Sequence, residues 1–127
     1  MDLFVGGKAQ GKLNYVLNKY DLSFNQVLDG ENINNISEIE NYKVFNHFNI
    51  WVKNMLLNSR DVYNEIELIL KINPEIIIIS DDLGNGIVPI DKFERNYREF
   101  LGRVLCTIAQ KSVNMERIIC GIGQKIK

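Results

Sequence analysis

Cysteine, histidine and proline are scarce in this chain, whose 127 residues hold two cysteines, one histidine and two prolines. Cys106 and Cys120 lack the C-x-x-C spacing of a metal or redox pair and have no histidine beside them. We therefore expect two buried thiols, without a disulfide, in a reducing compartment. The single histidine, His47, is interpreted as a strand-end or core residue rather than as a residue that takes part in catalysis.

Long apolar runs and an excess of charge are also missing. No apolar run reaches the ~18 residues that a membrane span needs, and the first residues lack the basic flank of a signal peptide. We therefore expect a cytoplasmic protein with no membrane partner. The 15 basic and 16 acidic residues give a formal net charge of -1, which argues against a nucleic-acid partner. The length and a hydrophobic share of 46% predict one domain over residues 1–127.

A glycine-rich stretch follows a short apolar run near the start of the chain. Residues 6–12 read G-G-K-A-Q-G-K and fit the first seven positions of G-x-x-x-x-G-K-[ST], the phosphate-binding loop between a strand and a helix. Backbone N–H groups and the helix N-terminus attract phosphate there, and the lysine reaches the terminal phosphates. The alternative is a glycine turn that only joins strand to helix. We predict nucleotide or phosphate binding by Gly6, Gly7, Lys8, Ala9, Gln10, Gly11, Lys12 and Leu13.

Support for Mg²⁺ is incomplete in the sequence. Leu13 stands where a Ser or Thr hydroxyl normally contacts the ion. Asp81 and Asp82 follow a run of four isoleucines, and the carboxyl ends of parallel strands are where ligands gather. Asp82 is therefore a candidate metal ligand and catalytic residue. For Asp81, a solvated turn is an equally good interpretation.

Extended and helical patterns alternate along the chain. The four isoleucines indicate a strand buried on both faces, which is typical of the centre of a parallel sheet. Residues 31–41 can form a loop or one short helix. The alternation predicts a three-layer parallel α/β fold. We expect helices at residues 11–20, from 50 to a break near 58–59, at 60–72, and from an Asp91 cap to about 111. We expect strands at residues 2–5, 24–28, 42–48, 75–80 and 115–120.

Several motifs resemble those of one enzyme family. Residues 81–89 read D-D-L-G-N-G-I-V-P, residues 98–103 read R-E-F-L-G-R, and residues 121–127 read G-I-G-Q-K-I-K. They resemble the adenosylcobinamide kinase / adenosylcobinamide-phosphate guanylyltransferase family, whose loop reads like N-E-V-G-x-G-I-V-P and whose next helix carries R-D-x-x-G-R-x-N-Q. Residues 46–54, N-H-F-N-I-W-V-K-N, are similar to its D-C-L-T-L-W-x-x-N.

The resemblance covers residues 1–17 and 42–127 and carries expectations about fold and function. It implies a P-loop NTPase-like fold, ATP or GTP as cofactor with Mg²⁺, adenosylcobinamide as substrate, and a homotrimer. It also implies that Lys12 and Asp82 are catalytic. The candidates for the loop that covers the substrate are Gly84, Gly86, Pro89, Arg98 and Arg103.

Departures from the family pattern concentrate on catalysis. Asn46 stands where the family has an acidic residue at a strand end, so Asn46 and Leu13 together weaken the Mg²⁺ site. Between residues 20 and 42 the chain is much shorter than the full-length enzymes, which carry their guanylylated histidine there. His47 matches the Cys of the family motif and does not inherit that role, so guanylyl transfer is expected to be lost or residual.

Three hypotheses remain open. The first is a shortened kinase that phosphorylates adenosylcobinamide with ATP or GTP. The second is a degenerate protein that keeps the fold and the nucleotide but not turnover. The third is a structural subunit of an oligomer. The losses at Leu13 and Asn46 favour the second hypothesis over the first.

Overall fold

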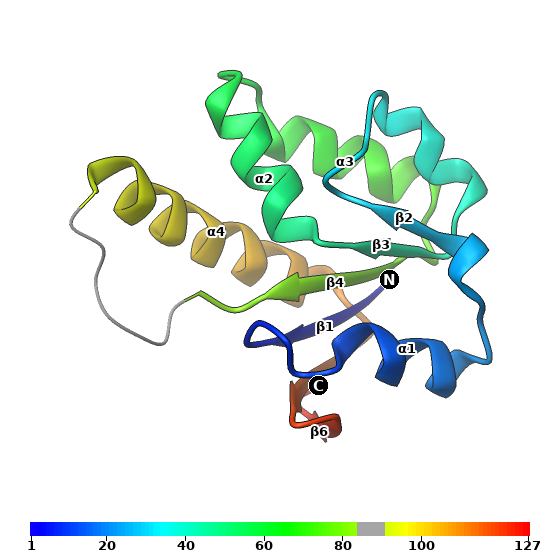
Figure 1. The fold of residues 1–127 in the computed structure, drawn as a ribbon. Coiled ribbons are helices and arrows are strands. Elements are labelled where there is room, and N and C mark those ends of the chain that lie inside the picture. The colour runs from blue at the N-terminus through cyan, green and yellow to red at the C-terminus, as the bar shows by residue number, and fades with distance from the viewer. Residues whose placement is uncertain (84–90) are drawn as a thin grey trace.

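The structure is a computed structural model that describes residues 1–83 and 91–127. Six strands form one sheet in the order β2-β3-β4-β1-β5-β6 (Figure 1). The first five strands run parallel, and β6 runs antiparallel to β5. The strands are β1 (Asp2–Gly6), β2 (Val27–Asp29), β3 (Val44–Asn46), β4 (Ile77–Asp81), β5 (Asn114–Ile119) and β6 (Ile122–Lys125). The α-helices are α1 (Lys12–Tyr20), α2 (Phe48–Leu57), α3 (Val62–Ile72) and α4 (Lys92–Lys111).

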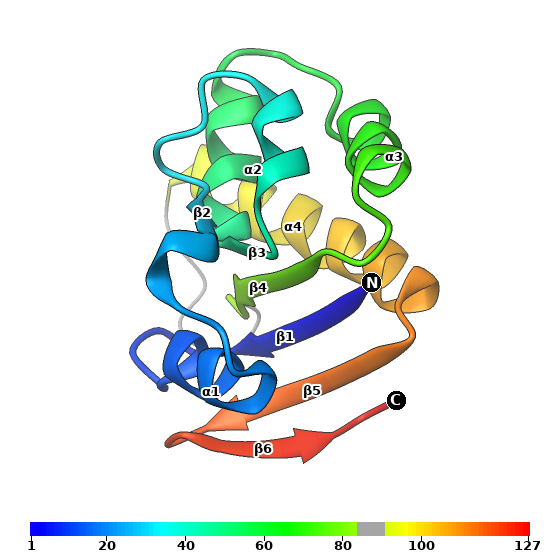
Figure 2. The same ribbon diagram turned by 90° about the vertical axis from the view of Figure 1, so that its right-hand side faces the viewer.

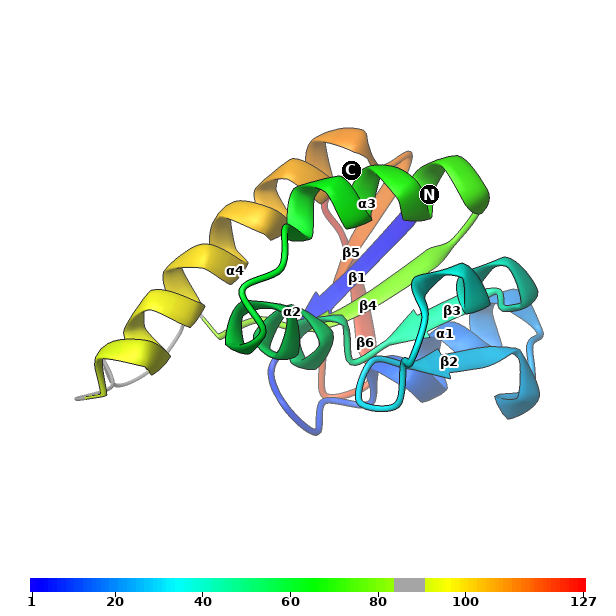
Figure 3. The same ribbon diagram turned by 90° about the horizontal axis from the view of Figure 1, so that it is seen from above.

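Two apolar layers cover the two faces of the sheet. Consecutive strand residues point to opposite faces, and in β1 Leu3 and Val5 pack with α2, α3 and α4, whereas Phe4 packs with Val16 of α1. The isoleucines of β4 divide in the same way, with Ile78 on the first face. Figure 3 shows α2, α3 and α4 on one side of the strands. The predicted three-layer α/β fold is therefore confirmed.

The sheet is mixed rather than purely parallel, because its sixth strand runs antiparallel to β5. This strand was not predicted. Cys120 and Gly121 form a two-residue turn with φ values of 50° and 76°, the backbone that joins tight hairpins. Ile119 then pairs with Ile122 across the turn. β6 consequently forms the sheet edge beside β5 (Figure 2). The short sequence G-I-G gave no strand signal of its own.

The expected burial of the two cysteines is wrong. Cys106 and Cys120 are both exposed and free. Cys106 lies on α4 between Val104 and Ile108, which face the core, and a helix turns by about 100° per residue, so the residue midway between two inward positions faces outward. Cys120 lies in the exposed hairpin turn.

Short elements differ from the predicted ranges. Residues 24–26 form a 3-10 helix instead of the start of a strand, and the other 3-10 helix, Ile36–Asn41, resolves the choice left open for residues 31–41. Each begins with a capping box, in which the side chains of the cap and of the third helical residue bond each other's backbone N–H.

In the described part of the chain, no helix combines the length and apolarity needed to cross a membrane.

Candidate functional site

The glycine loop, residues 6–12, leaves the carboxyl end of β1 and enters α1 (Figure 1). A Cβ on Gly6 would lie 2.4 Å from the carbonyl oxygen of Ile118, so only glycine fits where β1 approaches β5. Ala9 and Gly11 adopt left-handed φ values of 58° and 81°. Gly11 is the N-cap of α1, and no side chain caps this end. The N–H groups of the first turn are therefore open to an anion.

Contacts with distant segments hold the loop in place. The Gly121 N–H donates to the Gln10 carbonyl at 2.8 Å, and the Cys120 N–H donates to Gln10 Oε1 at 2.7 Å. At the other end of the loop, the Asp82 N–H donates to the Gly6 carbonyl at 2.8 Å. The β5–β6 turn and the end of β4 thus both fix the loop, which pre-organises it for a ligand.

Lys12 is buried beneath the loop, with 8% of the residue exposed. Its Nζ donates to the Gly7 carbonyl at 2.8 Å and lies 2.7 Å from Asp81 Oδ1. A buried ammonium needs such partners because its desolvation is costly. Lys12 is therefore a pre-placed cation under a loop that is open to anions.

Two residues that sequence reasoning did not single out position Asp81. Asn49 Oδ1 on α2 accepts the Asp81 N–H at 3.1 Å, and the buried Tyr97 hydroxyl on α4 donates to the Asn49 carbonyl at 2.7 Å. Burial raises the pKa of Tyr97 to about 12, so the hydroxyl keeps its proton at neutral pH. The available signal was one polar residue, Asn49, among buried apolar neighbours of α2.

A pocket of about 440 Å³ opens beside the loop. Leu13 contributes an alkyl side chain where the family pattern has a hydroxyl, and it also packs on the core under α1. Among the described residues the pocket has two carboxylates, those of Glu31 and Asp81, and the strand position of Asp81 is paired with Gly6. The structure thus brings together most of the predicted nucleotide-binding residues and Asn46. The lining is Lys8, Ala9, Gln10, Gly11, Lys12, Leu13, Asn14, Glu31, Asn46, His47, Ile50 and Asp81.

Other predicted site residues are not in the lining of this pocket. Asp82 is half-buried just after β4, and Arg98 is half-buried on α4. Arg103 is exposed, forms an ion pair with Glu99 one turn away, and lines a separate hollow on α4. Gly84, Gly86 and Pro89 lie outside the described residues.

A second polar group borders the pocket. Asp29, Glu31 and His47 each offer one ligand atom, and these atoms lie within 4.8 Å of one another. His47 follows β3, as expected for a strand-end residue, and is half-buried. Its Nδ1 lies 3.0 Å from Asp29 Oδ2. The contact between Asp29 and His47 was not predicted, because the two residues are 18 positions apart.

A larger hollow of about 690 Å³ lies apart from the loop, between the second 3-10 helix, α2 and α3. Trp51 and Met55, which form part of its wall, are 5% and 7% exposed and belong to the core. Its charged residues, Arg60 and Glu65, pair with each other at 3.3 Å. The convergent charges and the open helix end favour the pocket beside the loop as the candidate site.

Comparisons with known proteins agree with this architecture. A family model described as cobinamide kinase / cobinamide phosphate guanyltransferase, CobU, matches residues 22–126. The bifunctional adenosylcobalamin biosynthesis protein CobU of Salmonella typhimurium LT2 is 28% identical over 73 residues, which cover 54% of this chain and 40% of that protein. The protein of the same name from Escherichia coli K12 is 32% identical over 53 residues, 42% of this chain and 29% of that protein.

Two features of these matches bear on the site. The aligned region spans less than half the length of either curated relative. The family match begins at residue 22, after the glycine loop, so the assignment of the loop rests on its own sequence and geometry. The family match covers most of the chain and confirms the resemblance seen in the motifs. The chain therefore belongs to the cobinamide kinase / cobinamide phosphate guanyltransferase family and has the P-loop NTPase-like fold of that family.

Proposed function

We propose that this chain binds a nucleoside triphosphate, ATP or GTP, beside the glycine loop and acts in cobalamin biosynthesis as an adenosylcobinamide kinase-like protein. The observation that carries the proposal is the Lys12 ammonium, buried beneath the loop and bonded to Gly7 and Asp81. The family membership supports the reaction class, and the pocket supports the place where the nucleotide binds.

The pocket can attract an anion although Lys12 is already paired with Asp81. The uncapped start of α1 supplies N–H groups and positive potential. Asp81 neutralises Lys12 in the absence of a ligand, so an incoming phosphate must share the ammonium with this carboxylate or displace it. Phosphate oxygens form charge-assisted hydrogen bonds with an ammonium, as a carboxylate does, and the N–H groups at the start of α1 add contacts that Asp81 does not make with Lys12.

The proposed chemistry is in-line phosphoryl transfer from the nucleotide to the adenosylcobinamide hydroxyl. Such a reaction depends mostly on positioning and on neutralising charge at the transferred group. Lys12 is proposed to contact the terminal phosphates, and Asp82 remains a proposed catalytic residue and Mg²⁺ ligand. Arg98 is a proposed contact for substrate or phosphate.

A second candidate function is nucleotide binding without turnover. It is favoured by the alkyl side chain of Leu13 and the neutral amide of Asn46, both of which line the pocket. Neither can give Mg²⁺ the anionic or hydroxyl oxygens that it prefers. Guanylyl transfer is proposed to be residual or absent.

Calorimetric titration with GTP and ATP, with and without Mg²⁺, tests the binding site. The Lys12→Ala variant should bind nucleotide roughly 100-fold more weakly, because it removes a buried charge from the phosphate contact. Lys53→Ala is the matched control, since Lys53 pairs with Glu94 away from the pocket. Unchanged affinity in a folded Lys12→Ala variant would refute the site.

Turnover separates the two candidate functions. Incubation of the wild-type chain with nucleotide, Mg²⁺ and adenosylcobinamide should yield adenosylcobinamide phosphate if the kinase reaction survives. Nucleotide binding without product would support the degenerate protein instead.

A further inference from the structure

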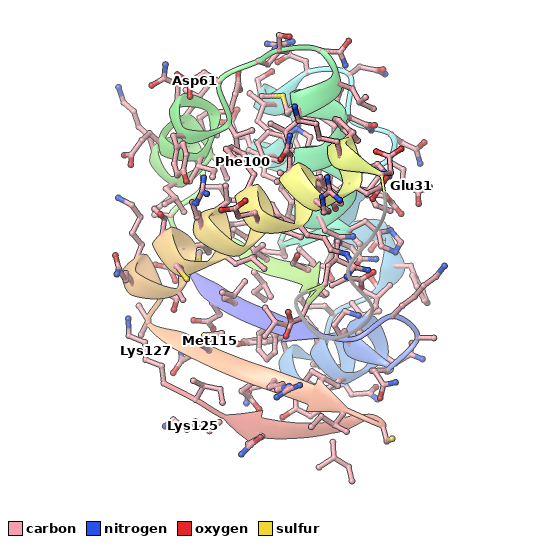
Figure 4. All side chains as sticks on the ribbon, turned by 90° about the vertical axis from the view of Figure 1, so that its left-hand side faces the viewer. Glu31, Asp61, Phe100, Met115, Lys125 and Lys127 are labelled. Carbon is pink, nitrogen blue, oxygen red and sulfur yellow. The ribbon has the colours of Figure 1, made fainter. Side chains whose placement is uncertain are left out.

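We propose that Asp29, Glu31 and His47, the Asp29–Glu31–His47 cluster, bind a divalent transition-metal ion, Mn²⁺ or Zn²⁺, at the rim of the nucleotide pocket. The three ligand atoms lie within 4.8 Å of one another. Glu31 and His47 line the same pocket as Lys12. In Figure 4 Glu31 lies on the side of the molecule toward which β1 and β4 point.

Strand pairing brings the cluster together. Asp29 is the last residue of β2 and is paired with Asn46, the last residue of β3. The Gly30 N–H donates to the Asn46 carbonyl at 2.8 Å, so the two segments stay joined beyond the strands. A Cβ on Gly30 would lie 2.3 Å from the carbonyl oxygen of His47. Glycine at this position therefore lets the turn that carries Asp29 and Glu31 pack directly on His47.

The Asp29 carboxylate is already oriented toward the imidazole. Its Oδ1 accepts the Glu31 N–H at 2.9 Å, and its Oδ1 and Oδ2 lie 3.1 and 3.0 Å from His47 Nδ1. Neighbouring ligand atoms around an ion with bonds of about 2.1 Å are separated by roughly 3 Å. An ion binding here displaces any proton on Nδ1, and that proton is released to solvent.

Asn46 adds a neutral donor beside the cluster. It is 7% exposed and lines the pocket with Glu31 and His47. An amide oxygen is an accepted ligand for divalent ions, so Asn46 can coordinate the ion directly or through its water.

The donor set selects the class of ion. Carboxylates suit Mg²⁺, Ca²⁺ and Mn²⁺, whereas imidazole suits Zn²⁺ and other transition metals. Two carboxylates with one imidazole therefore favour Mn²⁺ or Zn²⁺ over Mg²⁺. This ion would bring positive charge to a nucleotide pocket in which Leu13 and Asn46 have weakened the Mg²⁺ support. That role rests on the proposed function, whereas binding of the ion itself does not.

Titration of the full chain with Mn²⁺, followed by the electron paramagnetic resonance signal of the free ion and without nucleotide, tests the site. We expect one ion per chain, in competition with Zn²⁺. Asp29→Asn, Glu31→Gln and His47→Gln should each weaken binding roughly tenfold or more. Glu65→Gln is the matched control, because Glu65 also pairs with a basic side chain but lies outside the cluster. Absent binding, or equal binding in all four variants, would overturn the proposal.

A measurement on the unmodified chain avoids any dependence on folding of the variants. His47 is the only histidine, so its imidazole nitrogen resonances are unambiguous in a ¹⁵N spectrum. Zn²⁺ should shift the Nδ1 resonance at one equivalent, and Mg²⁺ should not. An unmoved resonance at saturating Zn²⁺ would overturn the assignment to His47.

The Lys12→Ala variant separates this proposal from the proposed function. It should lose nucleotide binding and keep its Mn²⁺ affinity. Retained Mn²⁺ binding in a wild-type chain that binds no nucleotide would count against the nucleotide site alone. Nucleotide binding in a chain that takes up neither Mn²⁺ nor Zn²⁺ would count against the metal site alone.

Discussion

The Lys12 ammonium and the Asp81 carboxylate form a contact of 2.7 Å at the floor of the glycine loop, and both side chains are largely buried, with 9% and 15% exposed. Asp81 belongs to β4 and Lys12 begins α1, so the ion pair joins two elements that are nearly 70 residues apart. Two carboxylates line the loop pocket among the described residues, those of Asp81 and Glu31. Asp81 is the one that contacts the lysine.

The first prediction concerns this ion pair. Asp81→Asn should lower the free energy of unfolding by about 3 kcal/mol, because removing one partner leaves a buried charge uncompensated. Phosphate or nucleotide should restore part of the loss by pairing with Lys12. Denaturant unfolding with and without ligand measures both effects. Glu94→Gln, which removes the more exposed pair with Lys53, should change stability by less than about 1 kcal/mol. Equal losses in the two variants would contradict the prediction.

The second prediction concerns the hydrogen bond that positions Asp81. Asn49→Ala should cost about 1–3 kcal/mol, because the Asp81 N–H loses its acceptor in a buried place. It should also weaken nucleotide binding by moving the carboxylate beside Lys12. Tyr97→Phe is the comparison, since it removes only the bond to the Asn49 carbonyl. If Asn49→Ala binds nucleotide like the wild type, Asn49 is not a positioning residue.

The third prediction tests the lost hydroxyl. Leu13→Thr should make nucleotide binding depend on Mg²⁺, with a tightening of roughly tenfold on adding the ion, because the hydroxyl couples the two ligands. Leu13→Val is the matched control, since valine has nearly the shape of threonine without the hydroxyl. Calorimetry with and without Mg²⁺ compares the two variants. Identical Mg²⁺ responses would show that position 13 does not face the ion.

The fourth prediction concerns acid stability. Glu116 on β5 accepts a hydrogen bond from the Tyr15 hydroxyl at 2.6 Å and pairs with Lys19 at 2.7 Å. Burial alone would raise the pKa of Glu116, but these two hydrogen bonds outweigh it, so the pKa lies below the ordinary value of 4.5. A depressed pKa adds stability above the unfolded pKa, and this stability is lost as the pH falls through the folded pKa.

Glu116→Gln should therefore be less stable than the wild type at neutral pH, and the difference should shrink as the pH falls below 4.5. Thermal unfolding across this range measures the difference. Glu99→Gln, which affects an exposed pair with Arg103, should show no such convergence. A constant gap between Glu116→Gln and the wild type at every pH would contradict the assignment.

The fifth prediction concerns assembly. The resemblance to the family implies a homo-oligomer, with a trimer as the expected state. The edge strand β6 and its neighbours expose Ile119, Ile122 and Ile126 by 48%, 72% and 54%, and such edges are prone to pair with another chain. Sedimentation analysis should show an oligomer that Ile122→Lys weakens. A monomeric wild-type chain would contradict the prediction.

Local sequence was sufficient for the long elements. The apolar spacing in α3 and α4, together with the Asp91 cap of α4, predicted helices whose ends in the structure lie within about two residues of the prediction. The N-cap of α3, Asp61, was not predicted, so that helix was expected to begin at residue 60. The isoleucine run likewise became the central strand β4. These features depend on periodicity and on capping chemistry within a few residues. The short strands β2 and β3 were predicted at residues 24–28 and 42–48, but with wrong bounds, because three-residue strands give too little pattern to fix their ends.

The register between β1 and β4 decides which carboxylate pairs with Lys12. Asp81 and Asp82 are adjacent, and neighbouring strand residues point to opposite faces. The pairing of Gly6 with Asp81 places that carboxylate beside the loop, and no local pattern distinguishes the two. The exposure of the two cysteines could not be predicted from local sequence either, because a small thiol occurs both in cores and in turns.

The sequence by itself determined the strand, glycine loop and helix that place Lys12, the alternation that makes a three-layer fold, and the family. Only the tertiary structure decided that Asp81 pairs with Lys12, that Asn49 and Tyr97 position Asp81 through hydrogen bonds, and that β6 forms an edge of the sheet. It also brought together Asp29, Glu31 and His47. The reason is physical: periodicity and capping act over a few residues, whereas contacts between distant side chains depend on strand order and register, which form only when the whole sheet packs.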